Sequence, residues 1–314
     1  MTDRRTFHKQ MLRGSLITLL PSAFSSLASG RQQGSNDAPY TLRLEVAARL
    51  FDGEKCWVHP RAGSVPAIRK NGSPRMVMTM NTLDLSGSDV FRGMYALTSD
   101  DLGRNWSDAK QLDTMAPRFE MIDGVRRPIA AADFWPKYHA NSQKLLGTGH
   151  TIVYTPDWKV ESPRPRHTCY AVYNADTEQW SAWEKLKMPE GEHFYSAGAG
   201  CVQRYDEEDG HILLPIYFSP PGHNSRVIVS RCSFDGSELR YLEHGNELRI
   251  DNDTRGLHEP SITRWQGRYF LTIRNDEKGF VSSSEDGLHF QTITEWTFDD
   301  GSPLGNYNTQ QHWV

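Results

Sequence analysis

Three features of the sequence predict an all-β fold, a β-propeller built from four-stranded antiparallel blades. From residue 40 onward, short alternating runs are broken by Gly, Pro, Asn and Asp, and no long stretch has a helical period. Apolar residues make up 37% and aromatic residues 11% of the 314-residue chain, which suits many half-exposed strands. The third feature is a turn that recurs at the same place in four successive units.

The recurring turn is clearest at Ser99-Asp100-Asp101-Leu102-Gly103-Arg104-Asn105-Trp106. We expect the Asp101 carboxylate to accept backbone N–H bonds inside the turn, Gly103 to supply a positive φ, and Trp106 to pack beneath it. Shortened versions are Asn174-Ala175-Asp176 with Trp180, Ser233-Phe234-Asp235-Gly236 with Leu239, and Ser284-Glu285-Asp286-Gly287 with Phe290. These carboxylates are expected to be structural.

Three strand-like runs precede each turn. The runs directly before the turns are residues 94–98, 167–173, 226–232 and 278–283. The second runs are 75–80, 144–154, 211–218 and 268–273, and the innermost runs are 65–68, 135–140, 199–204 and 260–264. Each unit is therefore predicted to be a four-stranded meander, with the turn between its third and fourth strands.

The end of the sequence looks like the start of another unit. Residues 308–314 resemble the innermost strand of a fifth blade, so about four to five blades are present. An incomplete ring would leave open strand edges, which are a liability for a β protein. We therefore expect residues 40–314 to be a propeller truncated at its C-terminus, with six or seven blades in the complete protein.

The first 39 residues have a different composition. Arg4 and Arg5 precede Phe7, followed by a short apolar run over 14–24 and small residues at 26–28. This pattern is typical of a twin-arginine export signal over 1–29, with a polar linker over 30–39; a Sec signal or a basic tail is the alternative. The run is too short to span a membrane, so we expect a periplasmic or secreted protein with no membrane partner after signal removal.

Charge and cysteine content argue against a nucleic-acid partner and against a disulfide framework. A net charge of -4 without a dense basic run argues against nucleic acid. The four cysteines lack a Cys-x-x-Cys spacing, which favours buried free thiols. No His and Asp set has a convincing ligand spacing, so no metal or cofactor is expected.

The recurring turns resemble the Asp boxes, or bacterial neuraminidase repeats, of the sialidase superfamily, over residue 45 to the end. The resemblance implies a propeller that acts on carbohydrate. Sialidases carry an aromatic-Arg-x-Pro segment, in which the arginine lies two residues before the proline. The counterpart here is residues 57–66, where Arg61 lies five residues before Pro66. The stretches 135–139 with 147–150, and 258–261 with 271–276, are more similar to rhamnosyl-glucuronate glycosidases and ulvan lyases. In that branch His, Tyr and Arg carry much of the chemistry.

The blade topology predicts where a site lies. Because the turn joins strands three and four, the opposite face collects the starts of first strands and the ends of second strands, where loops carry function. Its residues suit proton transfer and binding of a carboxylate. The catalytic candidates are His59, His139, Tyr195 and Tyr217, and the substrate-binding candidates are Arg61, Lys137, His258, Glu259, Arg274 and Asn275. The histidines could instead be packing residues, and Arg61 and Arg274 inter-blade ion-pair partners.

These observations predict an exported, exo-type glycoside hydrolase that cleaves a sialic or uronic acid-containing oligosaccharide or polysaccharide. Arg61 and Arg274 would anchor the carboxylate, and His59 or His139 would act as general acid or base. Sialidase-like chemistry would use a tyrosine nucleophile, which the resemblance places in a late blade. The alternatives are a polysaccharide lyase acting on uronic acid linkages and a non-catalytic glycan-binding propeller.

Overall fold

The computed structural model describes residues 44–66, 72–162, 164–191, 194–304 and 309–313. The chain divides into two compact units, Met1–Glu45 and Val46–Val314, and the described strands all belong to the second. The export signal expected over 1–29 and the linker over 30–39 lie outside the described residues. Within the described part, no helix is long and apolar enough to cross a membrane.

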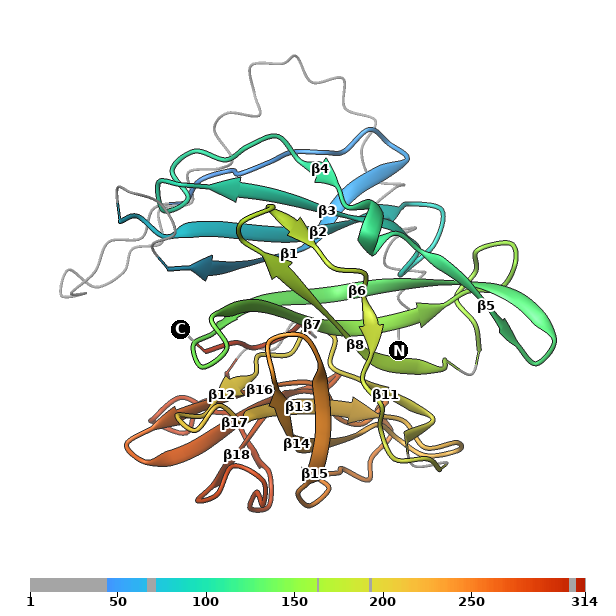
Figure 1. Ribbon diagram of the computed structural model, residues 1–314. Helices are drawn as coiled ribbons and strands as arrows, with labels where there is room; N and C mark the ends of the chain where they lie inside the picture. The colour runs from blue at the N-terminus through green and yellow to red at the C-terminus, as the bar shows by residue number, and fades with distance from the viewer. Residues whose placement is uncertain (1–43, 67–71, 163, 192–193, 305–308, 314) are drawn as a thin grey trace, which may run out of the picture. The chain divides into compact units, whose positions relative to one another are not determined.

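The first and last meanders are separate four-stranded antiparallel sheets, here called blades 1 and 4 (Figure 1). Blade 1 has the strand order β1 (Lys55–Val65), β2 (Arg75–Asp84), β3 (Phe91–Ser99) and β4 (Lys110–Gln111). Blade 4 has the strand order β16 (His258–Trp265), β17 (Arg268–Arg274), β18 (Gly279–Ser284) and β19 (Thr294–Glu295). The predicted all-β class and the meander order are confirmed here.

The two middle meanders, blades 2 and 3, share one 11-stranded sheet. Blade 2 comprises β6 (Val125–His139), β7 (Lys144–Val153), β8 (Arg166–Asn174), β9 (Gln179–Trp180) and β10 (Glu184–Lys185). Blade 3 comprises β11 (Ser196–Gly198), β12 (Tyr205–Asp206), β13 (Ile212–Phe218), β14 (Arg226–Phe234) and β15 (Leu239–His244). A short parallel pairing of β11 with β8 joins them. Before β6 lie a 3-10 helix, η1 (Asp113–Met115), and β5 (Arg118–Ile122), which pairs with β6.

The turn after the third strand is built by side chains. At the first turn, Ser99 Oγ donates to Asp101 Oδ1 at 2.8 Å, and the Asn105 N–H donates to the same carboxylate oxygen at 2.9 Å. These bonds lower the pKa of Asp101 to about 2, with the Asn105 backbone N–H as the largest cause. The turn of blade 4 repeats the arrangement around Asp286.

The turn of blade 2 differs from the expectation. The acceptor there is Asn174 Oδ1, which receives the N–H groups of Asp176 and Thr177, so Asp176 does not fill the role expected of it. An asparagine carbonyl can close the same kind of turn because its oxygen reaches backbone two and three residues on.

Three of the innermost strands differ from the prediction. β1 begins at Lys55 and β6 at Val125, about ten residues earlier than expected, and 199–204 lies between β11 and β12. The physical reason in blade 2 is the apolar run 129–134, whose side chains are buried between sheets. Lys137 and His139 therefore lie at the C-terminal end of the inner strand, on the side of the recurring turns. The prediction that they lie at its start is wrong.

Residues 309–313 lie against the inner strands. Gln203 exchanges two hydrogen bonds with the Trp313 backbone, at 3.1 and 2.8 Å. His312 Nδ1 lies 2.9 Å from Ser261 Oγ, and its Nε2 lies 3.3 Å from the Arg61 guanidinium. These five residues have no regular secondary structure, so the fifth-blade strand expected over 308–314 is not formed in the described part.

The core lies between facing sheets. One buried cluster joins blades 1 and 2 around Phe134, Trp180 and Trp183, and a larger one joins blades 3 and 4 around Phe218 and Leu271. The second strands are sandwiched, and every residue of β13 and all but the first of β7 are buried. This burial explains the continuously apolar sequence of β13, and it fixes the inner strands on which the site is built.

Candidate functional site

A left-handed backbone residue recurs on the innermost segment of all four blades. His59, Asp133, Cys201 and Glu259 have φ of 54°, 53°, 55° and 48°. In β1, β6 and β16 the ladder register shifts at this point, which marks a β-bulge. A non-glycine residue in this conformation costs of order 1–3 kcal/mol, and such strain concentrates at functional sites. We call these four residues the bulge cluster.

The bulges bring chemically different side chains together. His59 Nδ1 lies 2.5 Å from Asp133 Oδ1, and the ligating atoms of His59, Asp133 and Cys201 all lie within 4.8 Å of one another. Glu259 pairs with Arg274 of β17 at 2.5 Å. Each blade thus contributes one reactive group at an equivalent position.

A series of close polar contacts extends from the cluster into blade 3. Asp133 Oδ2 lies 3.1 Å from His150 Nε2, and His150 Nδ1 lies 3.1 Å from the Tyr217 hydroxyl. If His150 donates its Nε2–H to the carboxylate, its Nδ1 accepts from Tyr217. We call His59, Asp133, His150 and Tyr217 the relay.

The members of the relay differ in how their pKa values are shifted. Burial would raise the pKa of Asp133, but the charges and hydrogen bonds of His59 and His150 hold it well below its usual value. Burial opposes protonation of His59, yet Asp133 raises the pKa of His59 above its ordinary value. The His59 side chain is 26% exposed, compared with 10% for Asp133, so His59 is the member that can reach a ligand.

Buried polar groups surround the tyrosine end of the relay. Burial raises the pKa of Tyr217, whose ring lies 5.6 Å from that of His258. Burial, together with Arg255, lowers the pKa of His258 to about 3, so this imidazole is neutral. Among the described residues His258 Nε2 has no hydrogen-bond partner. A buried polar atom of this kind calls for a partner that a ligand can supply.

Two glycines make room for His150. A Cβ on Gly200 would lie 2.3 Å from His150 Nδ1, and one on Gly198 would lie 2.8 Å from its Cβ. The imidazole therefore packs directly on the backbone that leads to Cys201.

We expect Gly200→Ala to lower turnover by roughly tenfold to a hundredfold, because displacing His150 breaks its contacts with Asp133 and Tyr217. Steady-state kinetics tests this, with thermal melts to show that the chain is folded. Gly93→Ala is the control, because it introduces a Cβ in β3 near the flexible Gln111 side chain. Gly222→Ala is unsuitable as a control, because Gly222 has a positive φ that strains any other residue. Unchanged turnover in Gly200→Ala would contradict the role of His150.

Arg166 is positioned to bind an anion. Its Nε and Nη2 donate to the hydroxyls of Ser196 and Ser219 at 3.0 and 3.2 Å, and its guanidinium lies 4.5 Å from the centre of the Tyr217 ring. No described carboxylate pairs with it. Arg274, in contrast, is paired with Glu259, so its charge is already balanced. Arg166 is therefore better suited than Arg274 to receive a substrate carboxylate.

The predicted site residues fall into three groups. The structure brings His59, Tyr217, His258, Glu259 and Arg274 together around the bulge cluster, and Arg61 lies two residues beyond His59. It places Lys137 and His139 elsewhere. His139 is 1% exposed, and its ring nitrogens lie 2.8 Å from Ser142 Oγ and 2.9 Å from the Gly210 carbonyl, which is a packing role.

Asn275 and Tyr195 lie at the edges of the site. The Asn275 amide donates to Thr254 Oγ1 and to the Gly256 carbonyl, which fixes the loop before β16. Tyr195 is 40% exposed and directly precedes β11.

Asp133, Arg166 and His150 were not among the site residues predicted from the sequence. A signal for Asp133 was present, since a carboxylate in the apolar run 129–134 must be paired when it is buried. The close glycine pair 198 and 200 opposite a histidine had no comparable signal.

A metal ion is not required to satisfy the cluster. His59, Asp133 and Cys201 offer ligand atoms close together, but both Asp133 oxygens already face imidazole nitrogens. Burial and Asp133 raise the pKa of the Cys201 thiol well above its usual value, which opposes the thiolate form that metals prefer. All four cysteines are free thiols.

Comparison with known proteins defines the class of fold. The chain has the fold of the sialidase-like β-propellers. No family model matches the sequence, and no curated protein matches it.

Three solved structures show the likeness. A Hadza microbial sialidase, Hz136, matches with a TM-score of 0.52 and 14% identity over 76% of this chain and 46% of its own. Trypanosoma rangeli sialidase in complex with the inhibitor DANA matches with a TM-score of 0.51 and 16% identity over 82% and 42%. A Dyadobacter fermentans protein of unknown function matches with a TM-score of 0.52 and 12% identity over 77% and 69%. This chain thus spans less than half the length of these two sialidases, and the similarity establishes the fold.

Proposed function

We propose that this chain is a carbohydrate-active enzyme, a glycoside hydrolase that cleaves a glycosidic bond in an acidic glycan. The observation that carries the proposal is the half-buried His59, fixed at Nδ1 by Asp133 at 2.5 Å, while the rest of the imidazole remains partly exposed. An oriented imidazole with a raised pKa is suited to general acid catalysis near neutral pH.

The chemistry assigned to the relay is proton transfer. Protonated His59 gives its Nε2 proton to the glycosidic oxygen as the bond from that oxygen to the anomeric carbon breaks. Water then supplies hydroxide to the anomeric carbon and returns a proton to the imidazole. Asp133 stays ionised throughout and stabilises the imidazolium, as a triad carboxylate does.

Arg166 is assigned to the substrate carboxylate. We expect Arg166→Met to raise KM for an acidic substrate by roughly tenfold to a hundredfold, because a charge-assisted hydrogen bond is worth about 1.5–3 kcal/mol. The measurement is KM for matched acidic and neutral substrates. Arg240→Met, at the ion-paired turn of blade 3, is the control and should leave KM unchanged. Equal effects on acidic and neutral substrates would contradict carboxylate binding.

A polysaccharide lyase acting on uronic acid linkages is the second candidate. It is favoured by the state of the two bulge carboxylates, since Asp133 faces two histidines and Glu259 faces Arg274. Histidine and tyrosine remain as proton carriers. In a lyase one of them removes the proton at C5, the bond from C4 to the linkage oxygen breaks, and that oxygen takes a proton as the C4–C5 double bond forms.

One experiment tests both candidates. The full chain is incubated with oligosaccharides ending in sialic acid or uronic acid, and the products are followed by reducing-sugar release and by near-ultraviolet absorbance. Hydrolysis yields a new reducing end without absorbance, whereas elimination yields an absorbing unsaturated sugar. Saturable binding without either product would instead support a non-catalytic glycan-binding propeller.

The cellular setting belongs to the same proposal. Export by a twin-arginine signal to the periplasm or outside the cell would bring the enzyme to an acidic oligosaccharide or polysaccharide, and exo-type cleavage would release its terminal unit. The paired arginines at positions 4 and 5 support this setting.

A further inference from the structure

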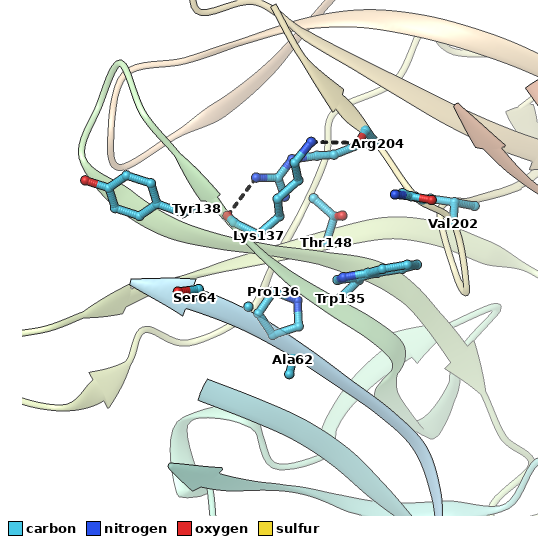
Figure 2. Close-up of a pocket in the computed structure, with 11 residues that line it drawn as sticks. Ala62, Ser64, Trp135, Pro136, Lys137, Tyr138, Thr148, Val202 and Arg204 are labelled. Atoms are coloured by element: carbon cyan, nitrogen blue, oxygen red, sulfur yellow. Dashed lines mark hydrogen bonds between the residues drawn. The ribbon is translucent and has the colours of Figure 1, made fainter. Parts of the chain in front are cut away.

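A cavity of about 330 Å³ lies apart from the relay, between the inner strands of blades 1 and 2 and residues 202–204. Figure 2 shows Lys137, Arg204 and Trp135 along it, with the side chain of Tyr138 nearby. Lys137 follows Asp133 by four residues on β6, which at about 3.3 Å per residue places it about 13 Å along the strand. The Lys137 end of the cavity is therefore distant from the bulge cluster, and none of the four cluster residues lines the cavity, although Val202 of the lining directly follows Cys201.

The lining has one sign of charge. It includes the cations Lys137 and Arg204 and, among the described residues, no carboxylate. Arg204 is balanced by Asp206, which lies outside the lining at 2.9 Å, whereas Lys137 Nζ is 3.8 Å from the second Asp206 oxygen. The two cations and one carboxylate leave a net positive charge at the wall.

The polar groups differ in how firmly they are held. Arg204 donates to the carbonyls of Leu146 and Lys137 and is rigid. The Lys137 ammonium donates to the Arg204 carbonyl at 3.0 Å and is 38% exposed, so it can turn its other N–H groups toward a ligand (Figure 2).

The rest of the lining suits a sugar. Trp135 and Tyr138 provide aromatic surface, and Ser64 and Thr148 provide hydroxyls. Aromatic faces with a few convergent polar groups and a volume near 300 Å³ are typical of a small-ligand site. We propose that this cavity is a second binding site for one anionic sugar unit of the hexuronate type, with Lys137 at its carboxylate and Trp135 against its ring.

Calorimetric titration of the full chain with sodium D-glucuronate tests the proposal, with methyl glucoside and sodium sulfate as comparison ligands. The expected result for the wild type includes a glucuronate site that Lys137→Gln weakens at least tenfold and Trp135→Phe also weakens. Glutamine retains a donor for the Arg204 carbonyl, and Lys110→Met in exposed β4 is the matched control.

The proposal deepens the proposed function by naming a uronate, but the two can fail separately. Glucuronate binding that is lost in Arg166→Met and unchanged in folded Lys137→Gln would overturn the second site and leave the relay site standing. Loss in Lys137→Gln without effect in Arg166→Met would support the cavity and count against carboxylate binding beside the relay. Equal binding of sulfate, or of methyl glucoside, would overturn the assignment to an anionic sugar.

Discussion

His59→Ala is expected to lower turnover by about 10²- to 10⁴-fold, the range found for removal of a general acid or base. The reason is that His59, alone among the relay members, combines a fixed orientation through Asp133 with a side chain that is 26% exposed. The measurement is kcat and kcat/KM on the substrate found by the product assay, with circular dichroism to confirm folding.

The pH profile of the wild type provides an independent reading of His59. Burial lowers the pKa of His59, but Asp133 outweighs burial and raises this pKa above its ordinary value of 6.5. The acid form is therefore present at neutral pH and is lost as pH rises through the folded pKa, so kcat/KM should fall on the alkaline side above 6.5. His59→Ala should lack this alkaline limb.

His139→Ala is the matched control. His139 is fully buried, and its ring contacts Ser142, Gly210 and the Phe234 ring, so its loss should destabilise the fold by about 1–3 kcal/mol. Turnover per folded molecule should be unchanged. Retained turnover in His59→Ala, or loss in folded His139→Ala, would contradict the assignment of catalysis to the bulge cluster.

The order of strands and turns within each blade could be predicted from the sequence because the signals for the turns and for the second and third strands are local. A turn that depends on one carboxylate or amide, as at Asp101 or Asn174, is determined by its own few residues. The second and third strands are apolar or alternating, so their positions in all four blades matched the prediction closely.

The inner strands could not be placed in the same way. Their bulges depend on residues from neighbouring blades, and nothing in the local pattern at Asp133 or Cys201 requires a left-handed backbone. His59 and Glu259 are each followed by proline, which is a partial signal. The position of β6 depended on burial of 129–134 between sheets, and that error moved Lys137 and His139 to the wrong end.

The same dependence on distant residues explains why Arg274 was predicted to bind the substrate carboxylate and Arg166 was not. Arg274 was chosen because it ends a second strand, but whether an arginine is free to bind substrate depends on the carboxylates near it. Glu259 reaches Arg274 across the bulge, while the groups that reach Arg166 are the neutral hydroxyls of Ser196 in β11 and of Ser219 directly after β13. Only the folded arrangement distinguishes the two.

Asp133→Asn is expected to lower kcat by roughly 10²- to 10⁴-fold, by analogy with removal of the carboxylate that orients a catalytic histidine. The carboxylate faces His59 with one oxygen and His150 with the other. An amide has only one acceptor oxygen, so its NH₂ group must face one of the two imidazoles, which then has to change tautomer or move. Asp133 acts through His59 and is a positioning residue.

The pH profile distinguishes this role from a purely structural one. Without the negative charge, burial becomes the dominant influence on His59, and its pKa falls below the ordinary value. The alkaline limb of kcat/KM should therefore move to lower pH in Asp133→Asn, whereas a variant that only loosens the fold would lower the amplitude and leave the limb in place. A limb at the wild-type position in a folded Asp133→Asn would show that Asp133 does not control the proton on His59.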